Sequence, residues 1–472
     1  MFWDQTSGLT EALLTLESIK KILWIDDVSY VLGQKKKEFQ IYRVEHAIAT
    51  LILSSLNPIS TFTAINHTKL YYTQIISSSN EASKKALEEG YVYRWGQDSV
   101  INLINKQYDD YEFEEIWCFN ILSQEKQFLV QLDFKNYVDN SILHPSLVED
   151  MELSPDESKL AFSIWRLGRP EPGKTGHCID IVVLEIPKNK TYYLHAENQI
   201  TIKRSPCWIN NNELVFTEEN YAKKEFRLWL WNSLHGTTKE CNVDIGSERP
   251  TSLLWNSEKS LLMVSSSTTL LSISLSQHTV EKIQIPESLL SKDSYQECTS
   301  FDHHFHFLAS IVEDLTTPPQ VVLYDLKREQ LTNLTALNSD KENILLGKIE
   351  PLTITTKDGI TAKGFLLYPV DHEPGKRYPL IIATYGFHGK RYALNVEEWH
   401  SSFPAQFFAN EGYCVLLLNP PSDNSQGMVN DSEKARKQCG WQKLRVFEQA
   451  VTTLVNQGLV DENKVGLYGW SH

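Results

Sequence analysis

Cysteine is scarce in this sequence, and its spacing excludes a disulfide framework. The 472 residues contain seven cysteines, scattered singly and without a Cys-x-x-Cys pair. An odd number of isolated cysteines in a long chain is typical of a reducing compartment. Residues 1–5 also lack the basic segment, followed by an apolar run, that marks a secretory signal. We therefore expect a cytoplasmic protein.

Positive charge and long apolar runs are lacking as well. The formal net charge is −15, whereas a nucleic-acid partner requires a basic surface. The short run Lys35–Lys37 is typical of a solvated turn. The most apolar early stretch, residues 47–56, is too short and too rich in Ser and Thr to cross a bilayer. These absences exclude nucleic-acid and membrane partners from our expectations.

What the sequence has is length, aromatic residues and a repeat. A chain of this length predicts two domains, and 12 Trp with 20 Tyr favour β-structure. A polar turn followed by a short apolar strand begins at Ser154 and returns at Ser205, Ser252 and Ser300. These starts are 51, 47 and 48 residues apart, about the length of one propeller blade of four strands.

The period predicts a β-propeller of about seven blades over residues 1–345. The apolar runs 179–186 and 320–326, each followed by a polar turn, fit strands within blades. The alternative is an unclosed pair of β-sandwiches, and the regular period favours the propeller. His303, His304 and His306 alternate, but no carboxylate or cysteine lies at ligand spacing. We therefore expect no metal and no cofactor.

Residues 346–472 change to an alternation of strands and helices, which predicts a mostly parallel sheet. The expected strands are 349–355, 361–368, 378–385, 413–418 and 463–468, and the expected helices are 401–410 and 441–457. The last strand leads into Gly469–His472, the first four positions of the pattern G-x-S-x-G. That pattern needs a sharp strand-to-helix turn that lifts the serine hydroxyl above the sheet. Ser471 is therefore the candidate nucleophile, with an ordinary serine in a strand–helix turn as the alternative.

Nearly the whole chain resembles the prolyl oligopeptidase family of serine peptidases. The resemblance is carried by the propeller pattern, by residues 376–382 and by residues 458–471. It implies a β-propeller followed by the N-terminal half of an α/β-hydrolase catalytic domain, acting on short peptides through an acyl-enzyme. It also implies that the backbone N–H of His472 is one oxyanion donor. Tyr385, at the end of an expected strand, takes the place of the second donor.

Two narrower expectations concern the substrate. Residues 178–184, 346–350 and 458–461 resemble the lasso-peptide isopeptidases, a branch of this family that opens the isopeptide-closed ring of a threaded peptide. The exopeptidases of the family hold the substrate amine with paired acidic residues. Glu218 and Glu219 are adjacent in the sequence, but adjacent acidic residues are mostly solvent-exposed. We therefore expect these two to be exposed surface residues with no role in binding the substrate amine.

An α/β-hydrolase triad runs Ser, Asp or Glu, then His along the chain, and only His472 follows Ser471. A serine without a general base is a poor nucleophile, so the chain by itself is expected to be inactive and to leave a parallel sheet edge open. Two functions follow. One is a serine peptidase, seen here as a fragment, a frameshifted copy, or one half of a split enzyme completed by a complementary C-terminal chain. The other is a non-catalytic propeller that binds a peptide or a partner protein.

Overall fold

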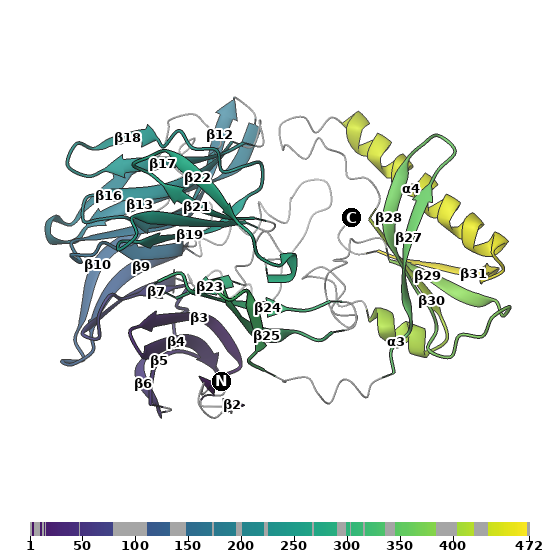
Figure 1. Ribbon diagram of the computed structural model, residues 1–472, viewed down its shortest axis with the longest axis horizontal. Coiled ribbons are helices and arrows are strands. Elements are labelled where there is room, and N and C mark those ends of the chain that lie inside the picture. Colours follow the sequence, from purple (N-terminus) through teal and green to yellow (C-terminus); the bar gives the residue numbers. More distant parts are fainter. Residues whose placement is uncertain are drawn as a thin grey trace. The chain divides into compact units, whose positions relative to one another are not determined.

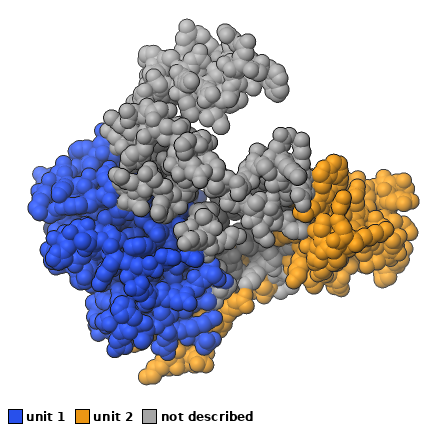
Figure 2. All heavy atoms as spheres, turned by 90° about the horizontal axis from the view of Figure 1, so that it is seen from above, with its two compact units in different colours: residues 1–284, 293–297 blue, residues 285–292, 298–472 orange. Residues whose placement is uncertain are grey.

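The structure is a computed structural model, and it describes most of the chain with gaps. The described residues are 2–3, 10–11, 14, 16–46, 48–78, 111–132, 148–171, 174–194, 201–220, 225–266, 269–289, 299–302, 304–314, 317–335, 345–383, 404–419 and 433–469. The chain divides into two compact units (Figure 2). Unit 1 contains residues 1–284 and 293–297, and unit 2 contains residues 285–292 and 298–472. The expected domain boundary at residue 345 stays a prediction.

Unit 1 consists mainly of five groups of four antiparallel strands, called sheets 1 to 5 in chain order (Figure 1), of which sheets 3 and 4 are joined into one eight-stranded sheet. Sheet 1 contains β3 (Ser18–Ile25), β4 (Val28–Lys35), β5 (Glu38–Glu45) and β6 (Ile48–Ser55). Sheet 2 contains β7 (Phe62–Thr63), β8 (Lys69–Ser78), β9 (Tyr111–Asn120) and β10 (Lys126–Leu132). Sheet 3 contains β11 (Val148–Leu153), β12 (Lys159–Glu171), β13 (Lys174–Glu185) and β14 (Lys190–Tyr193).

Sheets 4 and 5 repeat the same antiparallel order. Sheet 4 contains β15 (Thr201–Trp208), β16 (Glu213–Asn220), β17 (Glu225–Asn232) and β18 (Thr237–Glu240). Sheet 5 contains β19 (Pro250–Asn256), β20 (Leu261–Ser266), β21 (Leu270–Ser274) and β22 (Thr279–Ile283). A single parallel pair, Ile179 with Ile202, joins sheets 3 and 4. The remaining elements of unit 1 are the short paired strands β1 (Phe2–Trp3) and β2 (Thr10–Glu11), and the 3-10 helix η1 (Ile186–Lys188).

Consecutive sheets of unit 1 bury their apolar faces against each other. Successive side chains of a strand point to opposite faces, so the two faces of β13 serve different neighbours. Val182 and Leu184 pack in a cluster with side chains of sheet 2, including Ile116. Ile181 and Val183 pack instead with side chains of sheet 4. The first strands β7, β11, β15 and β19 also contact one another in sequence. This is the packing of propeller blades.

The sequence repeat is confirmed, but its register differs from the expected one. The residues that are equivalent from sheet to sheet are Asp or Asn residues at the turn between the first and the second strand. Their side chains accept hydrogen bonds from backbone N–H groups of the turn. In sheet 3, Asp156 Oδ1 accepts from Ser158 N at 3.0 Å. In sheet 4, Asn210 Oδ1 accepts from Asn212 N at 2.8 Å. Ser205, expected in a turn, lies within strand β15 instead.

Asn256 and Asp302 continue this series of turns. Asn256 Oδ1 accepts from Lys259 N at 2.8 Å, and Asp302 Oδ1 accepts from Phe307 N at 2.7 Å. Asp302 precedes the return strand of a sixth four-stranded sheet, which belongs to unit 2. Sheet 6 contains β23 (Thr299–Phe301), β24 (Phe307–Val312), β25 (Gln320–Asp325) and β26 (Gln330–Asn333), with the 3-10 helix η2 (Glu287–Leu289) before it. The described residues thus form six such sheets, whereas about seven blades were expected.

The rest of unit 2 is a five-stranded mixed sheet between helices. Its strand order is β27-β28-β30-β29-β31, and β29, β30 and β31 are mutually parallel. The elements are β27 (Ile349–Thr355), β28 (Thr361–Leu367), β29 (Tyr378–Ala383), α3 (Ala405–Asn410), β30 (Cys414–Asn419), α4 (Glu433–Asn456) and β31 (Val460–Tyr468). The expected strands and helices are therefore confirmed among the described residues, with α3 beginning later than expected and α4 and β31 beginning earlier. No helix in the described ranges is long and apolar enough to cross a membrane.

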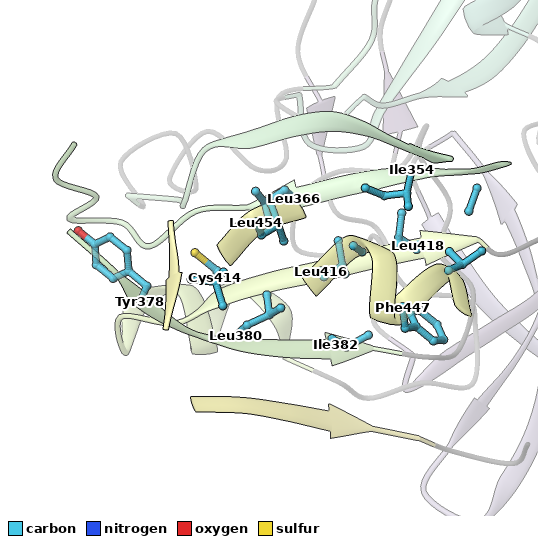
Figure 3. Packing of buried hydrophobic residues seen from close by; sticks show 14 residues of the cluster. Ile354, Leu366, Tyr378, Leu380, Ile382, Cys414, Leu416, Leu418, Phe447 and Leu454 are labelled. Carbon is cyan, nitrogen blue, oxygen red and sulfur yellow. The ribbon is translucent and has the colours of Figure 1, made fainter. Parts of the chain in front are cut away.

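Both faces of the mixed sheet are covered. Leu380, Ile382 and Leu416 point toward α4 and pack with Phe447 and Leu454 (Figure 3). Their sequence neighbours pack on the opposite face with Ala405 and Ala409 of α3. Burial on both faces explains why β29 and β30 are almost continuously apolar. It also holds the ends of these strands in a defined register.

Gly364 of β28 is a position where this sheet has no room for a side chain. A Cβ atom there would collide with the carbonyl oxygen of Leu417 and lie 2.8 Å from the Cα of Leu418. We expect Gly364→Ala to destabilise the protein by about 3 kcal/mol, since the backbone of β30 cannot yield cheaply. Chemical denaturation followed by circular dichroism measures this.

The matched control is Gly440→Ala in α4, where no atom lies within 4 Å of the added methyl group. Helix propensity alone then predicts a gain in stability of up to about 1 kcal/mol. Equal effects of the two substitutions would contradict the packing of β28 against β30.

Candidate active site

The candidate site is the edge of the mixed sheet where its parallel strands end. Ala383, the last residue of β29, pairs with Tyr468, the last residue of β31. Ala383 also pairs with Leu417, near the end of β30. In open α/β sheets, ligands bind outside the carboxyl ends of the strands. The segments that follow residues 383 and 468 therefore start from neighbouring strands whose last residues are paired.

The three residues predicted from sequence follow these strands. Tyr385 comes two positions after Ala383, and Ser471 and His472 come three and four positions after Tyr468. All three lie outside the described residues. Their roles stay predictions, and the structure contributes the strands that lead to them.

Strand β31 is the outermost strand of the described sheet. It pairs with β29 on one side, and most of its side chains are exposed, including Val465 at 38% and Leu467 at 68%. The other edge of β31 thus has backbone groups placed to receive another strand.

Among the described residues of unit 2, the reactive side chains of Cys414, His304 and His306 do not compete as nucleophile or metal site. Burial raises the pKa of the Cys414 thiol to about 12, and a buried thiol of that kind is inert. The rings of His304 and His306 stack with centroids 5.6 Å apart. His303 lies outside the described residues. Within the described ranges, no three His, Cys, Asp or Glu side chains form a cluster that fits a metal.

Glu218 and Glu219 of β16 are engaged with cations, so the expectation that they are solvent-exposed is wrong. Glu219 accepts from Arg249 Nη2 at 2.8 Å and from Nε at 3.1 Å. Its side chain is only 12% exposed. Glu218 lies 3.8 Å from the Nζ of Lys203, which is itself buried. Both carboxylates therefore serve as internal ion-pair partners.

Sequence reasoning missed a set of acidic contacts between the first strands of sheets 3 and 4. Glu149, Asp150 and Glu152 of β11 all accept hydrogen bonds from β15. The partners are Arg204 Nη1 at 2.9 Å, Ser205 N at 3.2 Å and Trp208 N at 3.1 Å, respectively. The only signal in the sequence is the presence of three acidic residues within a strand whose other residues are apolar.

Comparison with known proteins supplies the family context of this geometry. No family model matches the sequence. The lasso peptide isopeptidase AtxE2 of Asticcacaulis excentricus is 27% identical over 166 residues, which are 34% of this chain and 23% of that protein. The bovine prolyl endopeptidase FAP is 22% identical over 215 residues, 42% of this chain and 26% of that protein. The chain is a distant relative of the prolyl oligopeptidase family.

Solved structures agree on the fold of this distant relative. An acylaminoacyl peptidase of Pyrococcus horikoshii superposes with a TM-score of 0.61 at 14% identity, covering 96% of this chain and 66% of that one. A puromycin-hydrolyzing peptidase of Mycobacterium tuberculosis gives 0.57 at 11% identity, covering 96% and 65%. The matched segments span about a quarter of the first curated relatives, and the fold spans about two thirds of these solved chains.

The ion pair of Glu219 with Arg249 predicts a structural effect of substitution. We expect Glu219→Gln to destabilise unit 1 by about 2 kcal/mol, because Arg249 would lose its charged partner in a largely buried setting. Thermal unfolding measures this effect. Glu225→Gln, which removes the exposed ion pair with Arg227, is the control and is expected to leave the melting temperature unchanged. A Glu219→Gln variant of normal stability would contradict the structural role of this pair.

Proposed function

We propose that this chain carries the nucleophile of a serine peptidase, with Ser471 attacking the carbonyl carbon of a peptide bond. The observation that supports it best is the pairing of Ala383 with Tyr468. The segments that contain Tyr385 and Ser471 follow these two adjacent parallel strands in the sequence. A nucleophile elbow and its oxyanion donor need to lie at the same end of such strands. The distant relationship to prolyl oligopeptidase family peptidases supports the same reaction.

The proposed chemistry has two stages. The Ser471 hydroxyl loses its proton to a general base as it attacks, and the leaving amine takes a proton as the acyl-enzyme forms. The backbone N–H of His472 and the Tyr385 side chain would stabilise the oxyanion, a contribution of about 3 kcal/mol per donor. Water then hydrolyses the ester and releases Ser471. No metal or cofactor takes part in this scheme.

The proposed partner is a complementary C-terminal chain that supplies the acid and the base. The outer edge of β31 supports this proposal, because another parallel strand would pair with its backbone groups. A cytoplasmic location is part of the same proposal, and the free thiols of Cys118, Cys207, Cys241 and Cys414 are consistent with a reducing compartment.

The proposed substrate is a short peptide. The acylaminoacyl peptidase that shares this fold was solved in complex with Z-Gly-Gly-Phe-chloromethyl ketone, a peptide derivative. The relationship to a lasso peptide isopeptidase raises the isopeptide bond of a threaded peptide as a narrower alternative. Parallel assays with a linear peptide and a lasso peptide, each followed by mass spectrometry, separate these substrates.

Labelling with a fluorophosphonate probe tests the nucleophile. The 472-residue chain alone is expected to stay unlabelled, since a serine without a base reacts poorly. The chain extended by the sequence that follows codon 472 in its gene is expected to label at Ser471, with Ser471→Ala as the control.

Two results would count against this proposal. Labelling of the 472-residue chain alone would show that no complementary segment is needed. A gene that stops after codon 472, or continues without an Asp and a His, would favour the alternative of a non-catalytic propeller that binds a peptide or a partner protein.

A further inference from the structure

The contact between β11 and β15 differs from the other strand contacts of unit 1. The two strands are neighbours, yet in the described sheets each pairs its backbone with other strands. What joins them is the set of three carboxylates on β11, here named the carboxylate seam: Glu149, Asp150 and Glu152. Their partners advance along β15 in the same direction, from Arg204 through Ser205 to Trp208.

The backbone of β15 is shaped to meet this seam. Its register against β16 shifts between Arg204 and Cys207, and Ser205 has a left-handed φ of 53°. A bulge of this kind takes a residue out of the ladder, so the N–H of Ser205 is turned to Asp150. The side chain of Trp208 adds a second contact, because its Nε1 donates to the carbonyl oxygen of Glu152 at 3.2 Å.

Glu152 is the member of the seam with the least favourable site for a negative charge. Burial raises its pKa to about 8, and Asp150 on the same strand adds to the rise. The N–H of Trp208 and the ammonium of Lys21 on β3 act in the opposite direction. From β15, the buried thiol of Cys207 also faces this carboxylate. Lys21 is held in place by a hydrogen bond from its Nζ to Thr61 Oγ1 at 3.1 Å.

We propose that the carboxylate seam is a proton-dependent contact, in which Glu152 holds a proton while sheets 3 and 4 are joined and releases it when they separate. A protonated carboxyl still accepts the N–H of Trp208 through its carbonyl oxygen. In the separated state, the carboxyl returns to the ordinary range near 4.5. The joined state therefore binds one proton more between about pH 4.5 and pH 8, and raising the pH through that window weakens the seam.

Backbone hydrogen exchange of the 472-residue chain tests this proposal. After correction for the intrinsic exchange rate, the opening constant at the amides of Ser205 and Trp208 should rise by about tenfold per pH unit between roughly pH 5 and pH 8. Glu152→Gln keeps the shape and the acceptor but cannot ionise, so this variant should show no such rise. Lys21→Met removes the cation that favours the charged carboxylate and should extend the rise to higher pH.

The matched control is Glu149→Gln, the same substitution on the same strand in the more exposed ion pair with Arg204, and it should keep the pH dependence of the wild type. Amides of β20 and β21 in sheet 5 report whether opening is local. The proposal is overturned if Glu152→Gln retains the rise, or if sheet 5 shows a rise equal to that of the seam.

Discussion

Sheets 2, 3 and 4 of unit 1 have apolar side chains on both faces, and both faces must be buried away from water. The strands meet this requirement by stacking sheet against sheet, so that the two faces of β13 are buried by different neighbours. The apolar area removed from water in these stacks is the main favourable contribution to folding. The positions of the first strands, the acidic contacts among them and the buried ion pairs all depend on this stacking.

The same requirement is met differently in the mixed sheet of unit 2. There α3 and α4 cover the two faces, and the strands lie parallel because helices connect them. Parallel strands end at a common edge, and this edge is where the nucleophile elbow of an α/β-hydrolase is built. The distant relationship to peptidases and the register of β29 with β31 thus point to the same end of the same sheet.

Polar groups inside unit 1 are costly to bury, and its buried cations Lys203 and Arg249 have carboxylate partners. Lys203 lies between Asp180 at 3.6 Å and Glu218 at 3.8 Å, and Arg249 is held by Glu219. Such pairs contribute little net stability but are expensive to break. The carboxylates of β11 follow the same rule toward the backbone of β15. Acidic side chains such as Glu218 and Glu219, which the sequence suggested were on the surface, therefore form ion pairs inside unit 1.

Local patterns in the sequence predicted which described segments between residues 349 and 468 are strands and helices, because runs buried on both faces are continuously apolar and helices show their own period. The starts of α3, α4 and β31 were misjudged by three to eight residues. The four-strand repeat was also predictable, although its register was misjudged at Ser205. Ser and Pro are typical of turns, but here they form the bulge of β15. The acidic contacts of β11 were not predictable, since nothing in a strand reveals which strand of another sheet will lie beside it.

By itself, the sequence determined which segments are strands, where the turns recur, and that Ser471 follows a strand in a G-x-S-x context. Only the tertiary structure decided that β29 and β31, which are far apart in the chain, end as neighbours at Ala383 and Tyr468. Only the tertiary structure paired Glu219 with Arg249 and set Glu152 against Trp208. The physical reason is that periodicity records whether a face is buried, whereas the partner that buries it is chosen by packing between segments distant in sequence.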